Sequence, residues 1–218
     1  MDPEFWHQRW QNREIGFHLD HPNPRLTQHW DALELPPGSR ILVPLCGKSQ
    51  DLAWLARRGH RVLGVELSPI AVAEFFAEHE LQPQRLRRGP FESLAAGDIE
   101  ILCGDFFALD RNLTGPIDAV YDRAALVALP EPLRRRYAEQ IAELVPAGAQ
   151  LLLVTFDYAQ REMPGPPFAV GPEAVRDLYA AQFSIEHLAG ADVLDAEPRF
   201  RERGLSALRE EVFRLRRR

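Results

Sequence analysis

The chain has 218 residues, of which 45% are hydrophobic and 27% are charged. This composition is that of a folded globular protein and excludes a disordered or fibrous chain. The formal net charge is −6, whereas nucleic-acid-binding domains usually carry a clustered basic excess, so no nucleic-acid partner is expected. No apolar run approaches the roughly 18 residues that span a bilayer, so no membrane partner is expected either. The arginine runs 134–136 and 216–218 are interpreted as a solvated helix face and a chain end.

The two cysteines, Cys46 and Cys103, are 57 positions apart and have no partners at metal-ligand spacing. Two cysteines cannot form a disulfide framework, and the polar, acidic start of the chain does not resemble a signal peptide. These observations favour a reducing compartment, and we expect the protein in the cytoplasm. The seven histidines form no metal-binding pattern, so no metal is expected.

Stretches of β-forming residues alternate with stretches of helical period along the chain, which is typical of a parallel sheet with crossover helices. Residues 1–35 are expected to form a helical cap, and Ser49 and Ser68 are expected to cap the helices that follow the first two strands. Further helices are predicted over 132–144 and 172–183. The predicted strands are 40–45, 61–67, 99–103, 117–121, 149–156, 185–188 and 212–215.

This order of elements predicts one α/β domain over residues 1–218. Its core, residues 36–218, is expected to be a doubly wound, seven-stranded and mostly parallel sheet with an antiparallel hairpin at its end. Residues 1–35 would form an N-terminal lid on this Rossmann-like core.

The strongest site signal is the turn after the first predicted strand together with the acid that ends the second strand. The turn runs from Leu45 through Gly47, and Glu66 follows Leu45 by 21 residues. In open α/β sheets the first turn approaches a nucleotide ligand, and an acid about 20 residues later accepts hydrogen bonds from ribose hydroxyls. Glu66 therefore fits a nucleoside ligand, although a surface glutamate at a strand end would give the same pattern.

The kind of nucleoside is limited by the glycine content of this turn. A pyrophosphate-binding turn has the pattern G-x-G-x-x-G, and here Gly47 is the single glycine. A P-loop is excluded because Leu42 stands where its first glycine belongs. A neutral adenosine with an amino-acid tail needs no phosphate cradle, which points to S-adenosylmethionine.

Three further groups are candidates for the same site. Asp105 and Phe106 follow the third strand, where Asp105 could accept the adenine amino proton and either Phe106 or the next phenylalanine could stack; two core phenylalanines are the plain alternative. Asp122 and Arg123 end the fourth strand, and the planar guanidinium of Arg123 suits either the methionine carboxylate or the substrate. A mutual surface ion pair is the other interpretation of these two residues.

The N-terminal segment carries Trp6 and Trp10 four residues apart, which places them on one helical face. They either form an ordinary amphipathic cap or close a cofactor pocket. In the second case Trp10 would exclude water from the sulfonium and offer a ring face to the positive sulfur.

Four stretches together resemble the thiopurine S-methyltransferase family: FWHQRWQNREIGFH at 5–18, the block at 40–68 with the turn PLCGK, YDRAALVALP at 121–130 and PGPPF at 164–168. The turn PLCGK replaces the glycine-rich turn of most class I methyltransferases, which makes the resemblance specific. Two departures are Met163, where the family often has histidine, and the poorly matched stretch 198–204.

The resemblance implies a Rossmann-like class I methyltransferase that uses S-adenosylmethionine. It implies a small-molecule thiol or other chalcogen acceptor, a monomeric protein and, from bacterial relatives, resistance to selenium or tellurium oxyanions. Its cofactor ligands fall on Trp10, Leu45, Glu66 and Arg123, with Gly47, Asp105 and Phe106 as lesser candidates. Its substrate side falls on Phe17, Pro166, Pro167, Phe168 and Arg199.

The implied reaction needs little acid–base help, because the leaving group is a neutral sulfur and an aromatic thiol is substantially ionised near neutral pH. We therefore expect Arg123 and Asp122 to orient the reactants and no covalent nucleophile, Cys46 included, to take part. Two alternatives stay open. One is a non-catalytic S-adenosylmethionine sensor, and the other is a methyltransferase that acts on a protein or nucleic acid.

Overall fold

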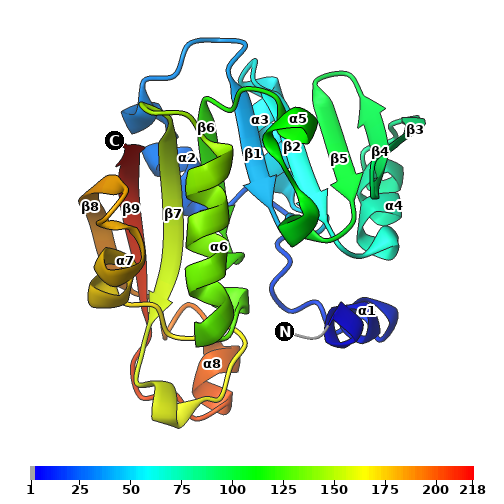
Figure 1. Cartoon of the computed structure of the whole chain (residues 1–218). Coiled ribbons are helices and arrows are strands. Elements are labelled where there is room, and N and C mark those ends of the chain that lie inside the picture. Colours follow the sequence, from blue (N-terminus) through cyan, green and yellow to red (C-terminus); the bar gives the residue numbers. More distant parts are fainter. Residues whose placement is uncertain (1–2) are drawn as a thin grey trace. The chain divides into compact units, whose positions relative to one another are not determined.

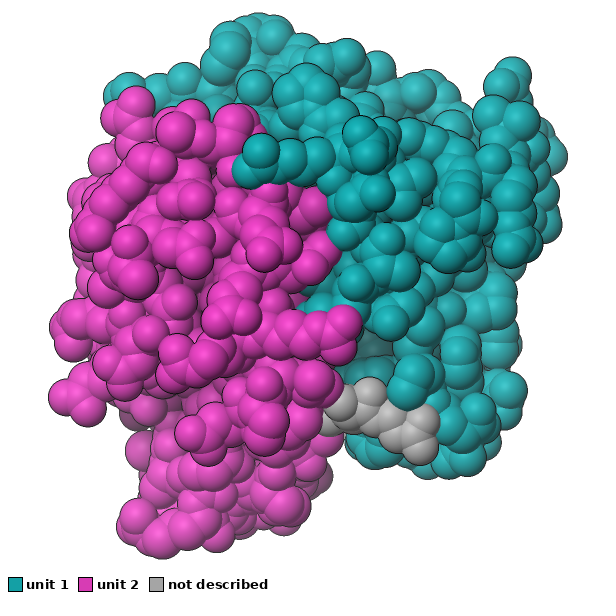
Figure 2. Space-filling view, viewed as in Figure 1, with its two compact units in different colours: residues 1–121 teal, residues 122–218 magenta. Residues whose placement is uncertain are grey.

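The computed structural model describes residues 3–218, so the first two residues of the predicted cap lie outside the described part. The chain divides into two compact units, Met1–Tyr121 and Asp122–Arg218 (Figure 2). The single domain over 1–218 and its division at residue 35 stay predictions.

The first unit contains the N-terminal helix and most of the predicted parallel strands (Figure 1). Its helices are α1 (Pro3–Gln11), α2 (Pro24–His29), α3 (Gln50–Arg57), α4 (Pro69–Glu78) and α5 (Arg111–Thr114), with 3-10 turns η1 (Trp30–Leu33) and η2 (Phe106–Ala108). Its strands are β1 (Arg40–Pro44), β2 (Arg61–Glu66), β3 (Gln84–Arg88), β4 (Phe91–Ala96), β5 (Ile99–Cys103) and β6 (Ala119–Arg123), whose last two residues belong to the second unit.

The strand order of the first unit is β3-β4-β5-β2-β1-β6, and β5, β2, β1 and β6 are parallel. The chain moves outward from β1 through β2 to β5 and then returns to the other side of β1. Strand order therefore reverses between β1 and β6, and ligands of open α/β sheets bind beyond the carboxyl ends of the strands at such a reversal. The predicted α/β class with a parallel core is confirmed.

The two predicted caps hold the helices that follow β1 and β2. Ser49 Oγ accepts a hydrogen bond from the backbone N–H of Asp51, and Ser68 Oγ accepts one from Ala71. Each bond satisfies a backbone donor that has no partner inside its helix. The caps fix where α3 and α4 begin. They therefore also fix where the turns end that join β1 to α3 and β2 to α4.

The predicted number of strands is wrong, since residues 3–218 form nine strands rather than seven. The two extra strands are β3 and β4, a hairpin that adds to β5 in antiparallel register. β3 lies at the edge of the sheet and its residues are mostly exposed. Its sequence QRLRR therefore shows no alternation of apolar and polar residues.

The second unit contains β7 (Gln150–Asp157), β8 (Phe183–Asp192) and β9 (Arg209–Arg217), with β9 antiparallel to both neighbours. The predicted terminal hairpin is thus confirmed, with longer strands than expected. Its helices are α6 (Glu131–Leu144), α7 (Pro172–Tyr179) and α8 (Pro198–Glu202), with 3-10 turns η3 (Leu126–Ala128) and η4 (Gln160–Glu162). Within residues 3–218, no helix has both the length and the apolar character needed to cross a membrane.

Candidate active site

The turn after β1 has a backbone that few residues adopt. Leu45 has φ +48° and Gly47 has φ +54°, both in the left-handed region. The N–H of Cys46 donates to the carbonyl of Val65 in β2 at 3.0 Å, which holds the turn against the end of the neighbouring strand. The turn therefore lies at the carboxyl ends of β1 and β2, as the sequence predicted for the ligand-binding edge.

Glu66 ends β2 with its side chain buried and 6% exposed. One carboxylate oxygen accepts from the backbone N–H of Gly47 at 2.8 Å, and the other accepts from Ser68 at 2.7 Å. Burial raises the pKa of this carboxyl, and hydrogen bonds from the backbone N–H groups of Ser68, Gly47 and Leu67 oppose the rise. A carboxylate has about four lone-pair sites. Acceptor capacity for a ribose hydroxyl thus remains, and these residues fit an adenosyl group.

Trp10 covers the turn from the N-terminal helix. Its side chain is 4% exposed, and an ideal Cβ on Gly47 would lie only 3.2 Å from Cζ2 of its ring. Phe17 packs edge-on against both Trp10 and Trp6, at centroid distances of 5.8 Å and 5.9 Å. The structure therefore brings Trp10 to the Gly47–Glu66 turn and joins Phe17, an expected substrate residue, to the same aromatic cluster.

An ion-pair network centred on a buried lysine lies beside this turn and was not predicted from the sequence. Lys48 is 7% exposed, and its ammonium contacts Glu74 at 2.8 Å and Glu78 at 2.6 Å, both on α4. Glu74 is also 3.8 Å from Arg13, just after α1. The network raises the pKa of Lys48 against the effect of burial and lowers the pKa of Glu74. The paired residues of this four-residue network are 26 to 61 positions apart, so no local motif predicted it.

Asp105 and Phe106 follow β5 in the first unit. Asp105 is exposed and accepts from the N–H of Phe107 at 2.9 Å, so it caps η2 and keeps one oxygen open to solvent or ligand. Phe106 is buried, and Phe107 is half-buried. Of the two rings offered for stacking, Phe106 is therefore the more deeply buried, and its role at adenine stays a prediction.

Asp122 and Arg123 belong to the second unit. Asp122 is 0% exposed, and its carboxylate accepts from the hydroxyl of Tyr137 at 2.8 Å and from the N–H of Leu126 at 3.2 Å. Burial raises its pKa to about 6. The sequence interpretation gave this carboxylate an open, ligand-facing position, whereas its contacts are those of a residue that positions the chain after β6. Arg123 is half-buried, and Ala124 next to it turns the backbone with φ +67°.

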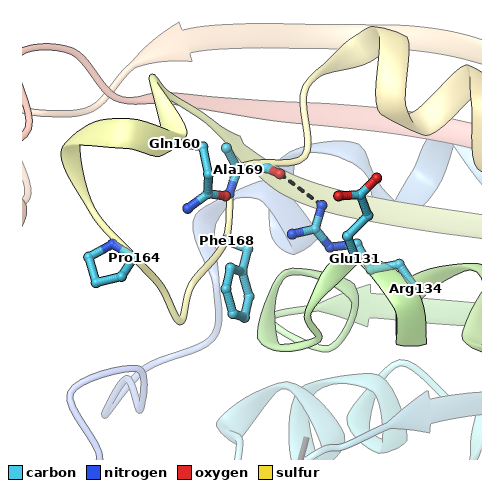
Figure 3. A pocket seen from close by; sticks show the side chains of 6 residues that line it. All are labelled: Glu131, Arg134, Gln160, Pro164, Phe168 and Ala169. Atoms are coloured by element: carbon cyan, nitrogen blue, oxygen red, sulfur yellow. Dashed lines mark hydrogen bonds between the residues drawn. The ribbon is translucent and has the colours of Figure 1, made fainter.

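The loop after β7 carries the expected substrate residues Pro166, Pro167 and Phe168. The carbonyl of Pro167 accepts from the hydroxyl of Tyr158 at 2.7 Å, and the N–H of Phe168 donates to Val127 at 2.7 Å. The loop is therefore fixed by contacts to its surroundings. It borders a pocket of about 460 Å³ at the start of α6 (Figure 3).

Arg199, the last expected substrate residue, lies on α8. It is paired with Glu197 at 2.9 Å, and its guanidinium lies 4.7 Å from the ring centroid of Phe200. Met163, where the family often has histidine, is a buried core residue next to Phe200 in one cluster. These contacts occupy Arg199 locally, and its reach toward a substrate stays a prediction.

Neither cysteine has the environment of a nucleophile. Burial raises the pKa of the Cys46 thiol well above its usual value and that of Cys103 to about 11. Both thiols are therefore protonated at neutral pH, and a thiolate is the reactive form. Among residues 3–218, no group of three or more His, Cys, Asp or Glu side chains is arranged to hold a metal ion.

Known proteins match this chain over its whole length. The family model "Thiopurine S-methyltransferase (TPMT)" matches residues 1–218. The chain belongs to the thiopurine S-methyltransferase family. The predicted family and the predicted enzyme class, a methyltransferase, are thereby confirmed.

Curated relatives agree in name and length. A thiopurine S-methyltransferase of Xanthomonas campestris pv. campestris (strain 8004) is 54% identical over 217 residues and covers 100% of both chains. A thiopurine S-methyltransferase of Pseudomonas aeruginosa (strain UCBPP-PA14) is 52% identical over 217 residues with the same coverage.

Solved structures share the fold at low identity. A SAM-dependent methyltransferase from Anabaena variabilis has a TM-score of 0.69 at 13% identity, covering 99% of this chain and 95% of its own. A Burkholderia thailandensis 1,6-didemethyltoxoflavin-N1-methyltransferase, solved with S-adenosylhomocysteine, has a TM-score of 0.65 at 18% identity, covering 99% and 86%. The class I, Rossmann-like methyltransferase fold is confirmed.

Proposed function

We propose that this chain transfers a methyl group from S-adenosylmethionine to the sulfur of aromatic or heterocyclic thiols, thiopurines included, and that selenium or tellurium compounds are further acceptors. The observation that carries the proposal is the buried Glu66 carboxylate bonded to the Gly47 turn at the strand-order reversal. The names of the relatives at 52% to 54% identity support the thiol acceptor.

The chain's own residues bind and orient the reactants in this proposal. Glu66 accepts the ribose hydroxyls, and the backbone at Leu45 and Gly47 lines the adenosyl group. Asp105 and Phe106 recognise adenine, with Asp105 accepting its amino proton. Trp10 shields the sulfonium from water. Shielding matters because a positive sulfur is more reactive toward an anion once water is excluded.

Arg123 orients an anion, either the methionine carboxylate or the acceptor, through its planar guanidinium. Asp122 acts as a positioning residue through Tyr137 and the backbone at Leu126. When bound, S-adenosylmethionine supplies a methyl group to which the acceptor's sulfur lone pair bonds as the carbon–sulfonium bond breaks. Positioning then supplies most of the rate acceleration, because the leaving group is neutral.

On the acceptor side we propose Phe17, Pro166, Pro167, Phe168 and Arg199. We also propose that the protein acts as a monomer in the cytoplasm, consistent with Cys46 and Cys103 both being free thiols. Resistance to tellurite or selenite would follow from methylation of those elements.

The direct test is incubation with methyl-labelled S-adenosylmethionine and a panel of aromatic thiols, a thiopurine, selenite and tellurite, with methylated products identified by mass spectrometry. Label on the thiol sulfur is the expected result. Tight cofactor binding without transfer to any acceptor would instead favour the non-catalytic sensor.

A further inference from the structure

A pocket of about 460 Å³ lies in the second unit, between the start of α6 and the loop after β7 (Figure 3). Glu131 and Arg134 line it from α6, and Gln160, Pro164, Phe168 and Ala169 line it from the loop. This volume falls within the range of small-molecule sites. The pocket thus combines an aromatic and a proline ring with three polar side chains.

The amide of Gln160 has no donor left for an anionic ligand. Its Nε2 donates to the carbonyl of Met163 at 2.7 Å and to the hydroxyl of Tyr158 at 3.2 Å, and its Oε1 accepts from the N–H of Ala169 at 2.9 Å. These bonds hold the loop in place from within. Recognition of a polar ligand group in the pocket therefore falls to the two charged residues.

Arg134 is the unusual residue of this pocket. Sequence analysis placed it on a solvated helix face, yet it is only 8% exposed. Its Nε donates to the carbonyl of Leu129 at 2.8 Å, its Nη1 donates to Ala169 at 3.1 Å, and its guanidinium lies 5.4 Å from the ring centroid of Phe168. All three contacts are with neutral groups.

Among residues 3–218, no carboxylate is bonded to the buried charge of Arg134. Burial lowers the pKa of its guanidinium, and the opposing acid, Glu131, is exposed at the helix start. A buried cation without a bonded anion is costly. A guanidinium with two donors fixed by carbonyls is also well oriented to bind an incoming anion.

We infer that Arg134 is a specificity-determining residue that selects acceptors carrying an anionic group on the aromatic ring, with the ring packed against Phe168 and Pro164. This inference rests on the proposed function, because it assigns the pocket to the methyl acceptor. Glu131 limits the preference, since its negative charge at the rim repels the same anion.

The test compares 4-mercaptobenzoate with its methyl ester as acceptors for the wild type, Arg134→Gln and Glu131→Gln. For each protein, kcat/KM for 4-mercaptobenzoate is divided by kcat/KM for the ester. Comparing this ratio between proteins cancels the difference in intrinsic reactivity between the two thiols. We expect the ratio to fall about tenfold or more in Arg134→Gln, through KM for the carboxylate acceptor. In Glu131→Gln, which changes an exposed side chain, we expect the ratio to rise.

Equilibrium binding of 4-mercaptobenzoate, measured by calorimetry on the same three proteins, separates this inference from the proposed function. Weaker binding in Arg134→Gln and tighter binding in Glu131→Gln support the inference even if no methyl is transferred, a result that overturns the proposed function alone. Unchanged ratios and unchanged affinities in both variants overturn the inference alone. If Arg134→Gln fails to fold, Glu131→Gln decides by itself.

Discussion

The backbone N–H of Gly47 donates a 2.8 Å hydrogen bond to the carboxylate of Glu66, and this bond ties the turn after β1 to the end of β2. It joins the two features of the sequence that first indicated a nucleoside site. The same carboxylate also accepts from Ser68, the cap of α4. One side chain therefore fixes the turn and the start of a helix while keeping capacity for a ligand.

We expect Glu66→Gln to weaken S-adenosylhomocysteine binding about 10- to 100-fold. A glutamine amide has one acceptor oxygen, so its NH₂ would face the N–H of either Gly47 or Ser68 and lose that bond. Calorimetry measures the affinity. The matched control is Glu78→Gln, which changes an acid near the same turn but outside the proposed site. Equal affinity loss in the two variants would contradict the role of Glu66.

We expect Gly47→Ala to lower the free energy of unfolding by about 1 to 2 kcal/mol, because a side chain at φ +54° is strained. The added Cβ would also lie 3.2 Å from the ring of Trp10 and displace it. Urea unfolding measures the first effect, and a change in tryptophan fluorescence reports the second. Gly97→Ala is the control, since it has the same sign of φ with nothing within 4 Å of its Cβ. The Trp10 contact is refuted if both variants show the same fluorescence.

Lys48→Met is expected to destabilise the protein by about 1 to 3 kcal/mol, because it leaves Glu74 and Glu78 without their shared cation. Urea unfolding gives the free energy. Arg85→Met breaks the exposed Arg85–Glu92 pair and should cost less than about 1 kcal/mol. A Lys48 effect no larger than the Arg85 effect would show that the network adds nothing to stability.

Asp122→Asn should remove a pH dependence of stability. Burial raises the pKa of Asp122 from 3.8 to about 6, so the native state binds this proton more tightly than the unfolded chain. The resulting stabilisation is complete below about pH 4 and is lost as pH rises through 6, an effect on the order of 3 kcal/mol.

The measurement for Asp122 is the difference in unfolding free energy between Asp122→Asn and the wild type, taken from pH 4.5 to 7.5. Relative to the wild type, the variant should gain stability across this range. Tyr137→Phe removes a hydrogen-bond donor to the carboxylate and so raises the pKa of Asp122 further. In that variant the loss of stability should occur at higher pH than in the wild type. A difference that stays flat with pH would contradict the burial of an ionisable Asp122.

Arg123→Ala should lower turnover on anionic acceptors more than it lowers cofactor affinity, if its guanidinium orients the acceptor. Steady-state kinetics and calorimetry give the two quantities. Arg123→Lys keeps the charge without the planar fork and should recover only part of the activity. The reverse pattern, with affinity lost and turnover kept, would assign Arg123 to the methionine carboxylate.

The sequence predicted those parts of the fold that local residue chemistry determines. Ser49 and Ser68 cap their helices as expected because a cap depends on residues two or three positions apart. The β3–β4 hairpin was not predicted. Its outer strand, β3, is held by backbone pairing to β4 and buries no face, so it has no alternating apolar pattern. The C-terminal end of α7 was expected at residue 183. It lies at Tyr179, because β8 begins at Phe183.

Within the candidate site, spacing along the chain predicted the Leu45 turn and Glu66 but not the contacts of individual side chains. The approach of Trp10 to Gly47 and the network around Lys48 depend on tertiary packing between segments far apart in sequence. The burial of Arg134 could not be predicted for the same reason, since the residues on either side of it on α6 are exposed or half-buried. The residue type alone does not show whether a charged side chain is buried or exposed.

The arginine-rich strand β3 has a consequence for how this protein meets other chains. As an edge strand it offers unpaired backbone groups to any extended segment, and Leu86 on it is 65% exposed. Arg85, Arg87 and Arg88 flank that leucine along the strand, with Arg85 paired to Glu92 and Arg88 paired to Glu100. A second copy that tried to extend the sheet here would bring like charges together and strip them of water, which makes β-type self-association at this edge unfavourable.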